Sequence, residues 1–429
     1  MPFNGSSSNR AQLAYRVEGT YPNNFGVTPT AGNGVLLAMT SETLDFQIKT
    51  LQSKAIRADR LPAELVQVSA SSAGGFNAEH VYREYDPFIA GALQQDYVVY
   101  GTNGVSTAIP TITATSTTLT AGAAPTGNDA FTGANGLLKG QWFTVIPAAA
   151  ASQSVKDYLA GRAFRVSTAT NPTASAITLD AATPFDTAKG GVSLTGASIS
   201  TSRVSNGTAT NGTATLMKTF SLEVQHQDIS QFRLYKGMAL SKMDMKLSVG
   251  EIVTLGFEFM GKDFALTQAT AMGGTPAASQ AFTPANATRG IFDVFEGGTS
   301  ISATTYIKSA DISFDNTLRG QEAVGVFGMA GIGLGTQAIT GKLELYFADA
   351  VMYTKFLNNT ASSLSIPVLD VQGNGYVYFF PRIKYTASKV AVGGQDQDNM
   401  LSLDWTALRE TDATSPWFNK SAVIFRVGA

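Results

Sequence analysis

The sequence predicts a mainly β protein with two tandem copies of one fold, each with one helix. A small all-β domain is predicted inside the first copy. Apolar residues recur at every second position in many short segments, which is the pattern of strands with one buried face. Strand, strand, helix and hairpin segments recur in the same order in two parts of the chain. Between about 103 and 214 the composition shifts to Thr, Ala, Ser and Gly, which indicates the inserted domain.

Charge and residue usage limit what the protein can do. Charged residues make up 14% of the 429 residues, against roughly 25% in ordinary soluble domains. We therefore expect other subunits to cover much of the surface, although a Thr-rich extracellular protein would share this composition. The formal net charge is −2 and no run of Lys or Arg occurs, so no general nucleic-acid-binding surface is predicted. With no cysteine and only two histidines, we expect no metal site, no cofactor and no enzyme activity.

The N-terminal segment lacks the basic and apolar regions of a signal peptide, and no apolar stretch is long enough to span a membrane. We therefore expect synthesis in a cytoplasm and no membrane insertion. Residues 1–38 form a polar arm rich in Gly, Asn and Pro, with one short strand at 12–18. The arm is either a disordered tail or a segment that becomes ordered on a neighbouring subunit. Three aromatic residues favour the second interpretation: Tyr15, Tyr21 and Phe25.

The first copy of the fold is predicted from two segments, 39–102 and 215–267. Alternating apolar residues indicate a strand around 44–48. Asp86 before Pro87 is typical of a helix start, with Asp86 as the N-cap and Pro87 as the first helical residue. A long hairpin follows at 243–259, with apolar residues alternating along both of its strands.

The inserted domain is predicted at 103–214 and is expected to face outward. Its strand-like segments are short and separated by turn residues: 141–146, 163–167, 176–180 and 192–195. We expect flexible flanks at 111–120 and 206–213. A plain linker is disfavoured because a linker needs no large aromatic residues such as Trp142, Phe143 and Phe164.

The second copy is predicted at 304–429, after a linker at 268–303. Its strand-to-helix step at 341–357 matches the step at 76–93 of the first copy. Two further matches are Thr317-Leu318 with Thr50-Leu51, and Lys389-Val390-Ala391-Val392-Gly393 with Lys246-Leu247-Ser248-Val249-Gly250. In the returning hairpin strands, an acid lies opposite the large apolar residues in both copies, Glu258 in one and Asp404 in the other. Four matches in one order favour a tandem repeat over chance.

Several polar patterns then resemble those of the major tail proteins of long, flexible-tailed bacteriophages. They cover nearly the whole chain outside about 103–214, and their number and order carry the resemblance. The matching segments are Gln12-Leu13-Ala14-Tyr15 with Phe25-Gly26-Val27-Thr28-Pro29, then Thr40-Ser41-Glu42-Thr43-Leu44, Ser53-Lys54-Ala55-Ile56-Arg57-Ala58-Asp59-Arg60, Phe220-Ser221-Leu222-Glu223 to Tyr235-Lys236-Gly237-Met238, and Gly250-Glu251-Ile252-Val253-Thr254.

The resemblance implies a structural virion protein in which each of the two tandem copies is a tail-tube β-sandwich or barrel fold with one flanking helix. Subunits of that family form a tube whose inner sheets join into one barrel around a channel, built around a tape-measure protein and closed by tail terminator and distal tail or baseplate proteins. Double-stranded DNA passes through it transiently, and the tube is assembled in the host bacterial cytoplasm. A single-copy subunit needs six chains for a ring, so a duplicated chain predicts a pseudo-sixfold trimer, with a hexamer as the alternative.

On this interpretation the residues of interest lie on assembly surfaces. Glu258 and Asp404 are expected to face the channel, with a solvent-exposed face or a subunit seam as the alternative. Residues predicted to contact the neighbouring ring are Tyr15, Tyr21, Phe25, Gly250 and Glu251.

Other patterns carry weaker meanings. The glycine-rich run at 328–335 has the wrong spacing for a phosphate-binding loop, so a flexible inter-strand loop is favoured. Asp396 and Asp398 fit a hairpin turn better than a calcium loop. His80 and His226 are expected to be structural. The remaining rivals are a type VI-like secretion tube protein and a β-rich adhesin or carbohydrate-binding protein.

Overall fold

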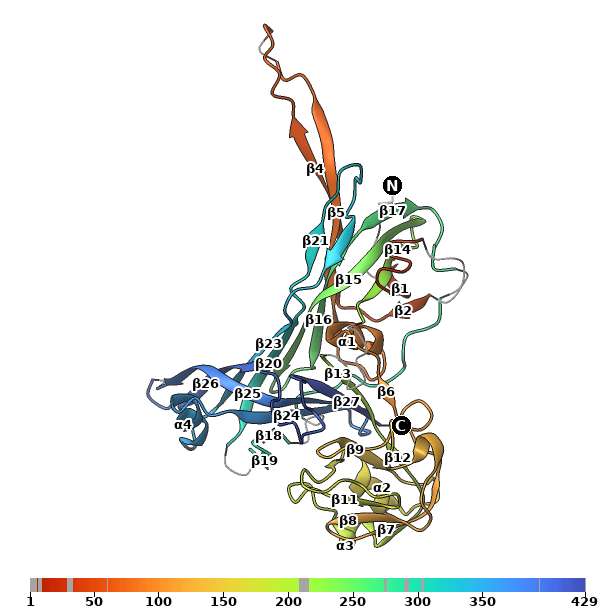
Figure 1. The fold of residues 1–429 in the computed structure, drawn as a ribbon, viewed down its shortest axis with the longest axis vertical. Coiled ribbons are helices and arrows are strands. Elements are labelled where there is room, and N and C mark those ends of the chain that lie inside the picture. Colours follow the sequence, from red (N-terminus) through yellow and green to blue (C-terminus); the bar gives the residue numbers. More distant parts are fainter. Residues whose placement is uncertain are drawn as a thin grey trace.

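The chain, in a computed structural model, is described for residues 6, 10–28, 34–59, 61–207, 216–273, 276–288, 293–301, 305–392 and 394–428 (Figure 1). It is mainly β, as the sequence predicts, with a few short helices. We call the part from β1 to β6 together with β14 to β17 the first block, β7 to β12 the insert, and β18 to β27 the second block. The strand β13 links the insert to the first block.

The first block contains β1 (Ala11–Thr20), β2 (Val35–Leu37), β3 (Ser41–Glu42), β4 (Asp45–Gln52), β5 (Leu65–Glu79), α1 (Asp86–Leu93), β6 (Val98–Val99), β14 (Lys218–His226), β15 (Gln231–Ser248), β16 (Thr254–Gly261) and β17 (Asp263–Thr267). The insert and its link contain β7 (Ile109–Ala114), β8 (Thr118–Ala121), η2 (Gly127–Asp129), β9 (Trp142–Ile146), α2 (Gln153–Leu159), β10 (Ala163–Arg165), β11 (Ala176–Thr178), α3 (Thr187–Gly190), β12 (Ser193–Ser200) and β13 (Ser202–Ser205). The second block contains β18 (Phe295–Glu296), β19 (Thr299–Ser300), β20 (Ile307–Asp315), β21 (Arg319–Gln321), β22 (Gly331–Gly333), β23 (Ala338–Tyr346), α4 (Val351–Leu357), β24 (Ser362–Leu369), β25 (Gly375–Ala391), β26 (Met400–Ala407) and β27 (Val423–Val427).

The two blocks share one strand order. Hydrogen-bonded neighbours run β4–β5–β16–β15–β14 in the first block and β20–β23–β26–β25–β24 in the second. A helix follows β5 in one block and β23 in the other. The strands β16 and β26 even alternate buried and exposed residues in the same pattern, with Glu258 and Asp404 at the same exposed position. One further pairing, β15 with β20, joins the blocks into a single 19-stranded sheet.

The long strands β15 and β25 each belong to two layers. Their first halves pair with β14 and β24, in a covering layer that also contains β1, β17 and β27. Their second halves pair with β16 and β26, in a layer that we call the polar-faced layer, with β5, β20 and β23. One face of the polar-faced layer packs into a core shared by both blocks, where Phe88 of α1 contacts Phe76, Phe220 and Phe257. Its other face carries polar residues, because strand side chains alternate between faces.

The insert is a six-stranded sheet, ordered β10-β9-β12-β7-β8-β11, with its own apolar core. It is not simply tethered. Trp142 enters a core of the second block, with its ring centroid 5.1 Å from that of Phe295. The Arg165 guanidinium lies over both rings and donates a hydrogen bond to the Gly298 carbonyl at 2.8 Å. The linking strand β13 pairs with β27, which belongs to the covering layer of the second block, and with β6 of the first block.

Three local expectations were wrong. Residues 111–120, expected to be flexible, form most of β7 and β8, because threonine is β-branched and Ile112 and Leu119 are buried. The helix cap is Tyr85 rather than Asp86, which lies in the first turn. In the duplicated hairpins, Thr254 faces Lys246 and the equivalent Met400 faces Ala391. Lys246 therefore corresponds to Ala391 and not to Lys389, a shift of two residues that keeps the same faces.

The arm and the predicted linker also differ from expectation. The strand β1 pairs along its whole length with β14 of its own chain, and β2 extends that sheet. Within 268–303, β18 and β19 form a hairpin whose first strand pairs with β24. Much of the second flexible flank, 208–213, lies outside the described residues.

Candidate functional site: a polar sheet face, its two ends and its open edges

The polar face of the layer carries charged residues in cross-strand rows. Lys242 lies between Glu258 on β16 and Asp315 on β20, and Lys342 on β23 lies between Asp404 and Asp311. Acidic residues outnumber lysines on these strands. Over all strands of the layer, including β5 and the second half of β25, they are Glu79, Asp244, Glu258, Asp311, Asp315, Glu344 and Asp404, against Lys242, Lys246, Lys308, Lys342, Lys384 and Lys389. The face is therefore polar and nearly neutral.

Two ion pairs repeat on this face at neighbouring same-face positions of one strand. The Lys242 Nζ lies 2.8 Å from Asp244 Oδ2, and the Lys342 Nζ lies 2.8 Å from Glu344 Oε1. These hydrogen bonds raise the pKa of both lysines, and the Lys342 ammonium lowers the pKa of Glu344. Lys242, Lys342 and Glu344 therefore stay charged at neutral pH.

The two ends of the polar-faced layer differ. At one end the β4–β5 hairpin projects far beyond the body (Figure 1). Its exposed apolar residues have no core to enter: Ile48, Leu51, Ile56, Leu61, Leu65, Val66 and Val68. At the other end lies the β15–β16 turn with exposed Gly250 and Glu251, because Thr254 pairs with Glu79, the end of β5 remote from the hairpin tip.

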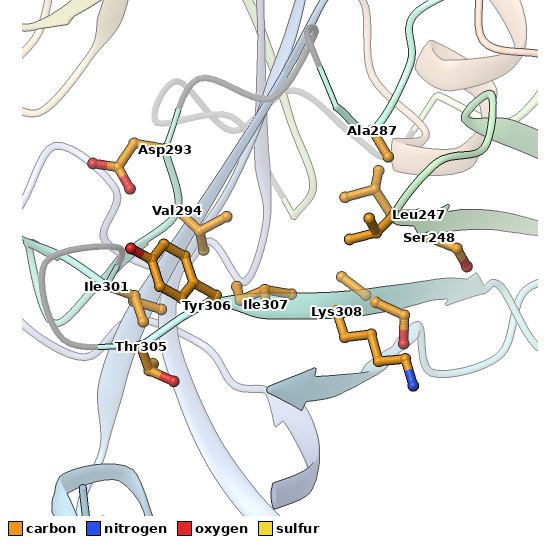
Figure 2. Close-up of a pocket in the computed structure, with 13 residues that line it drawn as sticks. Leu247, Ser248, Ala287, Asp293, Val294, Ile301, Thr305, Tyr306, Ile307 and Lys308 are labelled. Atoms are coloured by element: carbon orange, nitrogen blue, oxygen red, sulfur yellow. The ribbon is translucent and has the colours of Figure 1, made fainter. Parts of the chain in front are cut away.

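A pocket of about 200 Å³ lies beside that turn (Figure 2). Leu247, Val294 and Ile307 give it an apolar lining, and Tyr306 is largely exposed next to it. The apolar hairpin and this pocket thus mark opposite ends of the same layer.

The polar-faced layer also has two open lateral edges. Within the described residues, the β3–β4 edge pairs with β5 on one side and with no strand on the other. In the second half of β25, residues from Ala387 to Ala391 pair with β26 alone.

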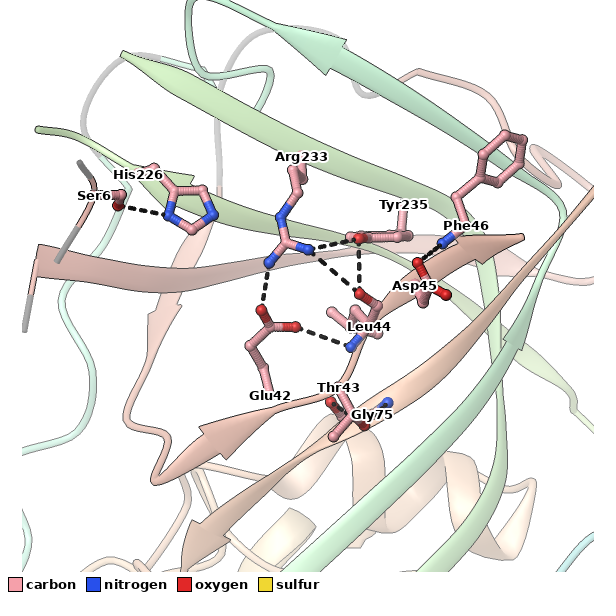
Figure 3. Close-up of polar contacts among 10 residues, drawn as sticks. All are labelled: Ser6, Glu42, Thr43, Leu44, Asp45, Phe46, Gly75, His226, Arg233 and Tyr235. Carbon is pink, nitrogen blue, oxygen red and sulfur yellow. Dashed lines mark hydrogen bonds and ion pairs between the residues drawn. The ribbon is translucent and has the colours of Figure 1, made fainter. Parts of the chain in front are cut away.

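Side chains close the β3–β4 edge at Leu44 (Figure 3). The Leu44 N–H donates to Glu42 Oε2 at 2.9 Å, and the Leu44 carbonyl accepts a hydrogen bond from the Tyr235 hydroxyl at 2.9 Å. Arg233 forms an ion pair with Glu42 and reaches the Leu44 carbonyl at 3.5 Å. Burial raises the pKa of Tyr235, so its hydroxyl keeps its proton and can donate.

The two histidines lie in different surroundings. His80 is fully buried, its Nε2 lies 2.8 Å from the Tyr378 hydroxyl, and burial lowers its pKa to about 4. His226 Nδ1 lies 3.0 Å from Ser6 Oγ (Figure 3). Among the residues that the structure describes, no group of three or more His, Asp or Glu side chains is placed to hold a metal ion. Over the same ranges, no helix is both long and apolar enough to cross a bilayer.

A family model described as phage tail tube protein matches residues 8–407. The chain belongs to the phage tail tube protein family. Tail tube proteins of this family are structural components of the virion and not enzymes. A comparison with curated protein sequences found no match.

In this tail tube protein, the predicted site residues divide into two groups. Tyr15 is 8% exposed and Phe25 is 9% exposed, both within the chain's own cores, and the Tyr21 hydroxyl accepts a hydrogen bond from Ile332 N. Their contacts within the chain hold the arm on its own subunit. Gly250, Glu251, Glu258 and Asp404 are exposed.

Sequence reasoning missed the projecting hairpin and the Leu44 cluster. The hairpin could have been noticed in the sequence, because apolar residues recur from Ile48 to Val68 and no other segment was predicted to cover them. The cluster could not be noticed there, because Glu42 and Arg233 lie 191 positions apart.

Proposed function

We propose that three copies of this chain close into a pseudo-sixfold ring, and that stacked rings form the hollow tail tube of a long-tailed phage, through which DNA is delivered. The observation that carries the proposal is the β15–β20 joint inside the chain. Because the blocks share one strand order, this joint has a counterpart formed by two edges that are both open in a single chain: the second half of β25 and the β3–β4 edge.

The strand registers specify how the two open edges would pair. Lys242 and Ala387 hold equivalent positions, opposite Glu258 and Asp404, and Asp45 and Ser313 hold equivalent positions on β4 and β20. Within the chain, Asp244 lies opposite Ser313. Transferring this register places Lys389 of one subunit opposite Asp45 of the next. The opposite charges support the pairing.

In this ring the polar face lines the channel. Glu258 and Asp404 then recur around it at equivalent heights, and the face has no excess of cations to hold DNA, since binding to DNA depends on cations that neutralise phosphates. The covering layer lies outside. The insert therefore faces outward, because β13 attaches it to β27, a strand of that layer.

Stacking brings unlike ends together. The apolar β4–β5 hairpin of one ring meets the turn end of the next, where Gly250, Glu251 and the apolar pocket lie. Such a head-to-tail contact is heterologous and continues without limit, as a tube requires. We further propose a tape-measure protein inside, terminator and distal tail proteins at the ends, and assembly in the host cytoplasm.

Paired cysteines test the ring, since the chain has none of its own. The variant carrying Lys389→Cys and Asp45→Cys should form disulfides between subunits on assembly, because opposite residues of an antiparallel pair lie about 5 Å apart between Cα atoms, within disulfide reach. Denaturing non-reducing gels should then show covalent trimers as the end product.

A matched control uses Ala387→Cys with Thr43→Cys, which the proposed register separates by four positions and which should not cross-link. Ladders that end at six chains would support a hexamer instead. Cross-linking of the control pair but not of the first pair would overturn the register.

A further inference from the structure

The backbone N–H and carbonyl groups of Leu44 point away from the neighbouring strand β5. The Thr43 N–H donates to the Gly75 carbonyl of β5 at 2.8 Å. Neighbouring residues of an antiparallel strand direct their backbone groups to opposite sides, so the N–H and carbonyl of Leu44 face the open edge. An open pair of this kind is a template for another strand.

Three side chains occupy both of these groups. Glu42 accepts from the Leu44 N–H, Tyr235 donates to the carbonyl, and Arg233 joins Glu42 to the same carbonyl (Figure 3). Glu42 and Arg233 come from different layers, and their side chains are 20% and 28% exposed. Tyr235 is buried. The edge is therefore closed by partly buried, charge-assisted contacts.

The second block shows what the same position looks like when a strand covers it. Ile312 is the equivalent of Leu44, and it lies opposite Met245 of β15. The positions equivalent to Glu42, Arg233 and Tyr235 hold Ala310, Tyr378 and Phe380. None of these makes the corresponding contact, and the Tyr378 hydroxyl instead bonds His80. Of these two equivalent positions, both within the described residues, the cluster is present at Leu44, which has no partner strand, and absent at Ile312, which β15 covers.

We propose that Glu42, Arg233 and Tyr235 form a latch that closes the β3–β4 edge of the free subunit and opens when a second copy of the chain adds its β25 there. The proposal rests on the ring proposed above. In the transferred register Val390 of the incoming subunit lies opposite Leu44 and exchanges both backbone hydrogen bonds with it. The latch slows this pairing in solution, so that subunits remain unassembled until a growing tube end supplies the complete neighbouring surface.

Two variants test the latch: Tyr235→Phe, which removes only the hydroxyl, and Glu42→Gln, which removes the charge. Each should polymerise from purified subunits about three- to tenfold faster than the original chain, the factor that corresponds to one hydrogen bond. Tyr378→Phe, which removes a buried hydroxyl away from the edge, should leave the rate unchanged. If one latch variant fails to fold, the other still decides.

Hydrogen exchange at the Leu44 amide gives a second readout. The amide should be protected in the free subunit, exchange faster in free Glu42→Gln, and be protected again in tubes of both. Unchanged or slower polymerisation of the latch variants, with normal folding, would overturn the latch. The latch substitutions can also be combined with Lys389→Cys and Asp45→Cys to separate the two proposals. Cross-linked trimers that form at an unaltered rate would refute the latch alone. Failure to form cross-linked trimers would refute the ring register.

Discussion

The first and second blocks share a strand order, yet different segments and side chains cover their edges. In the first block the ten-residue β1 lines β14, helix α1 is buried, and side chains close the β3–β4 edge. In the second block the two-residue β18 lines β24, α4 leaves Val351 and Leu357 exposed, and β20 is covered by β15. The fold is therefore repeated, while the side chains at each boundary depend on what lies next to it.

The largest expected effect on stability concerns the contact between the insert and the second block. Trp142 of the insert is fully buried against Phe295 there. Trp142→Ala should lower the free energy of unfolding by about 3–5 kcal/mol, the usual loss for a buried tryptophan. Chemical denaturation measures the loss, and hydrogen exchange in β24 and β27 locates it.

Phe143→Ala is the control, because the neighbouring Phe143 side chain belongs to the insert's own core. It should loosen the insert and leave β24 and β27 protected. If Trp142→Ala behaves in the same way, the insert is only tethered, and its removal would not expose the second block.

The second prediction concerns two equivalent positions, one directly after β5 and one directly after β23. His80 is buried at the first, whereas Phe347 is partly exposed at the second. Burial lowers the pKa of His80 from 6.5 to about 4. Between these values the unfolded chain binds a proton that the folded chain does not, so stability falls as pH drops from 6.5 to 4 and is complete above 6.5. The loss from this group is about 3 kcal/mol at most.

Unfolding measured at several pH values should show this loss in the original chain and not in His80→Gln, which keeps a hydrogen-bonding side chain for Tyr378. Carboxylates titrate in both proteins, so only the difference between the two curves reports His80. Parallel curves would show that His80 is not shielded from protons in the fold.

The third prediction concerns the seam between subunits. Lys389→Asp would place two acids opposite each other across the proposed pair with Asp45, at a cost of about 0.2–1 kcal/mol per seam. Assembly should require several-fold more protein, as followed by light scattering, and the double variant Lys389→Asp with Asp45→Lys should restore it. A double variant no better than the single one would argue against this register.

The smallest effect on stability is expected at the proposed channel face. Glu258 and Asp404 are exposed and lie opposite Lys242 and Lys342, so changing both to Lys should lower the unfolding free energy by about 0.2–1 kcal/mol at each position. Tubes of this variant should retain double-stranded DNA at low salt and release it at high salt, as measured by co-sedimentation. Equal DNA retention by both tubes would place the two residues outside the channel.

The sequence predicted those elements that depend on local patterns. Alternation gave the hairpin of β15 and β16, and Asp86-Pro87 gave the start of α1 to within one residue. The Thr-rich strands β7 and β8 were not predicted, because threonine is common both in strands and in exposed linkers.

Features made by distant segments were beyond reach of the sequence pattern. The arm was expected on a neighbour, but β1 pairs with β14 some 200 positions away in its own chain. Glu42, Arg233 and Tyr235 look like ordinary strand residues until the two layers bring them to Leu44. The charged rows around Glu258 and Asp404 could be predicted in part. The alternation of apolar residues indicated the face on which the two acids lie, but their cross-strand partners follow only from the strand registers.

Electron microscopy of assembled tubes tests the central claim most directly, because the blocks and the insert can be counted separately. Each ring should show six similar wall units around the channel and three insert densities on the outside, one for every second unit. Six inserts around a ring of twelve wall units, or a wall without paired units, would contradict the pseudo-sixfold trimer.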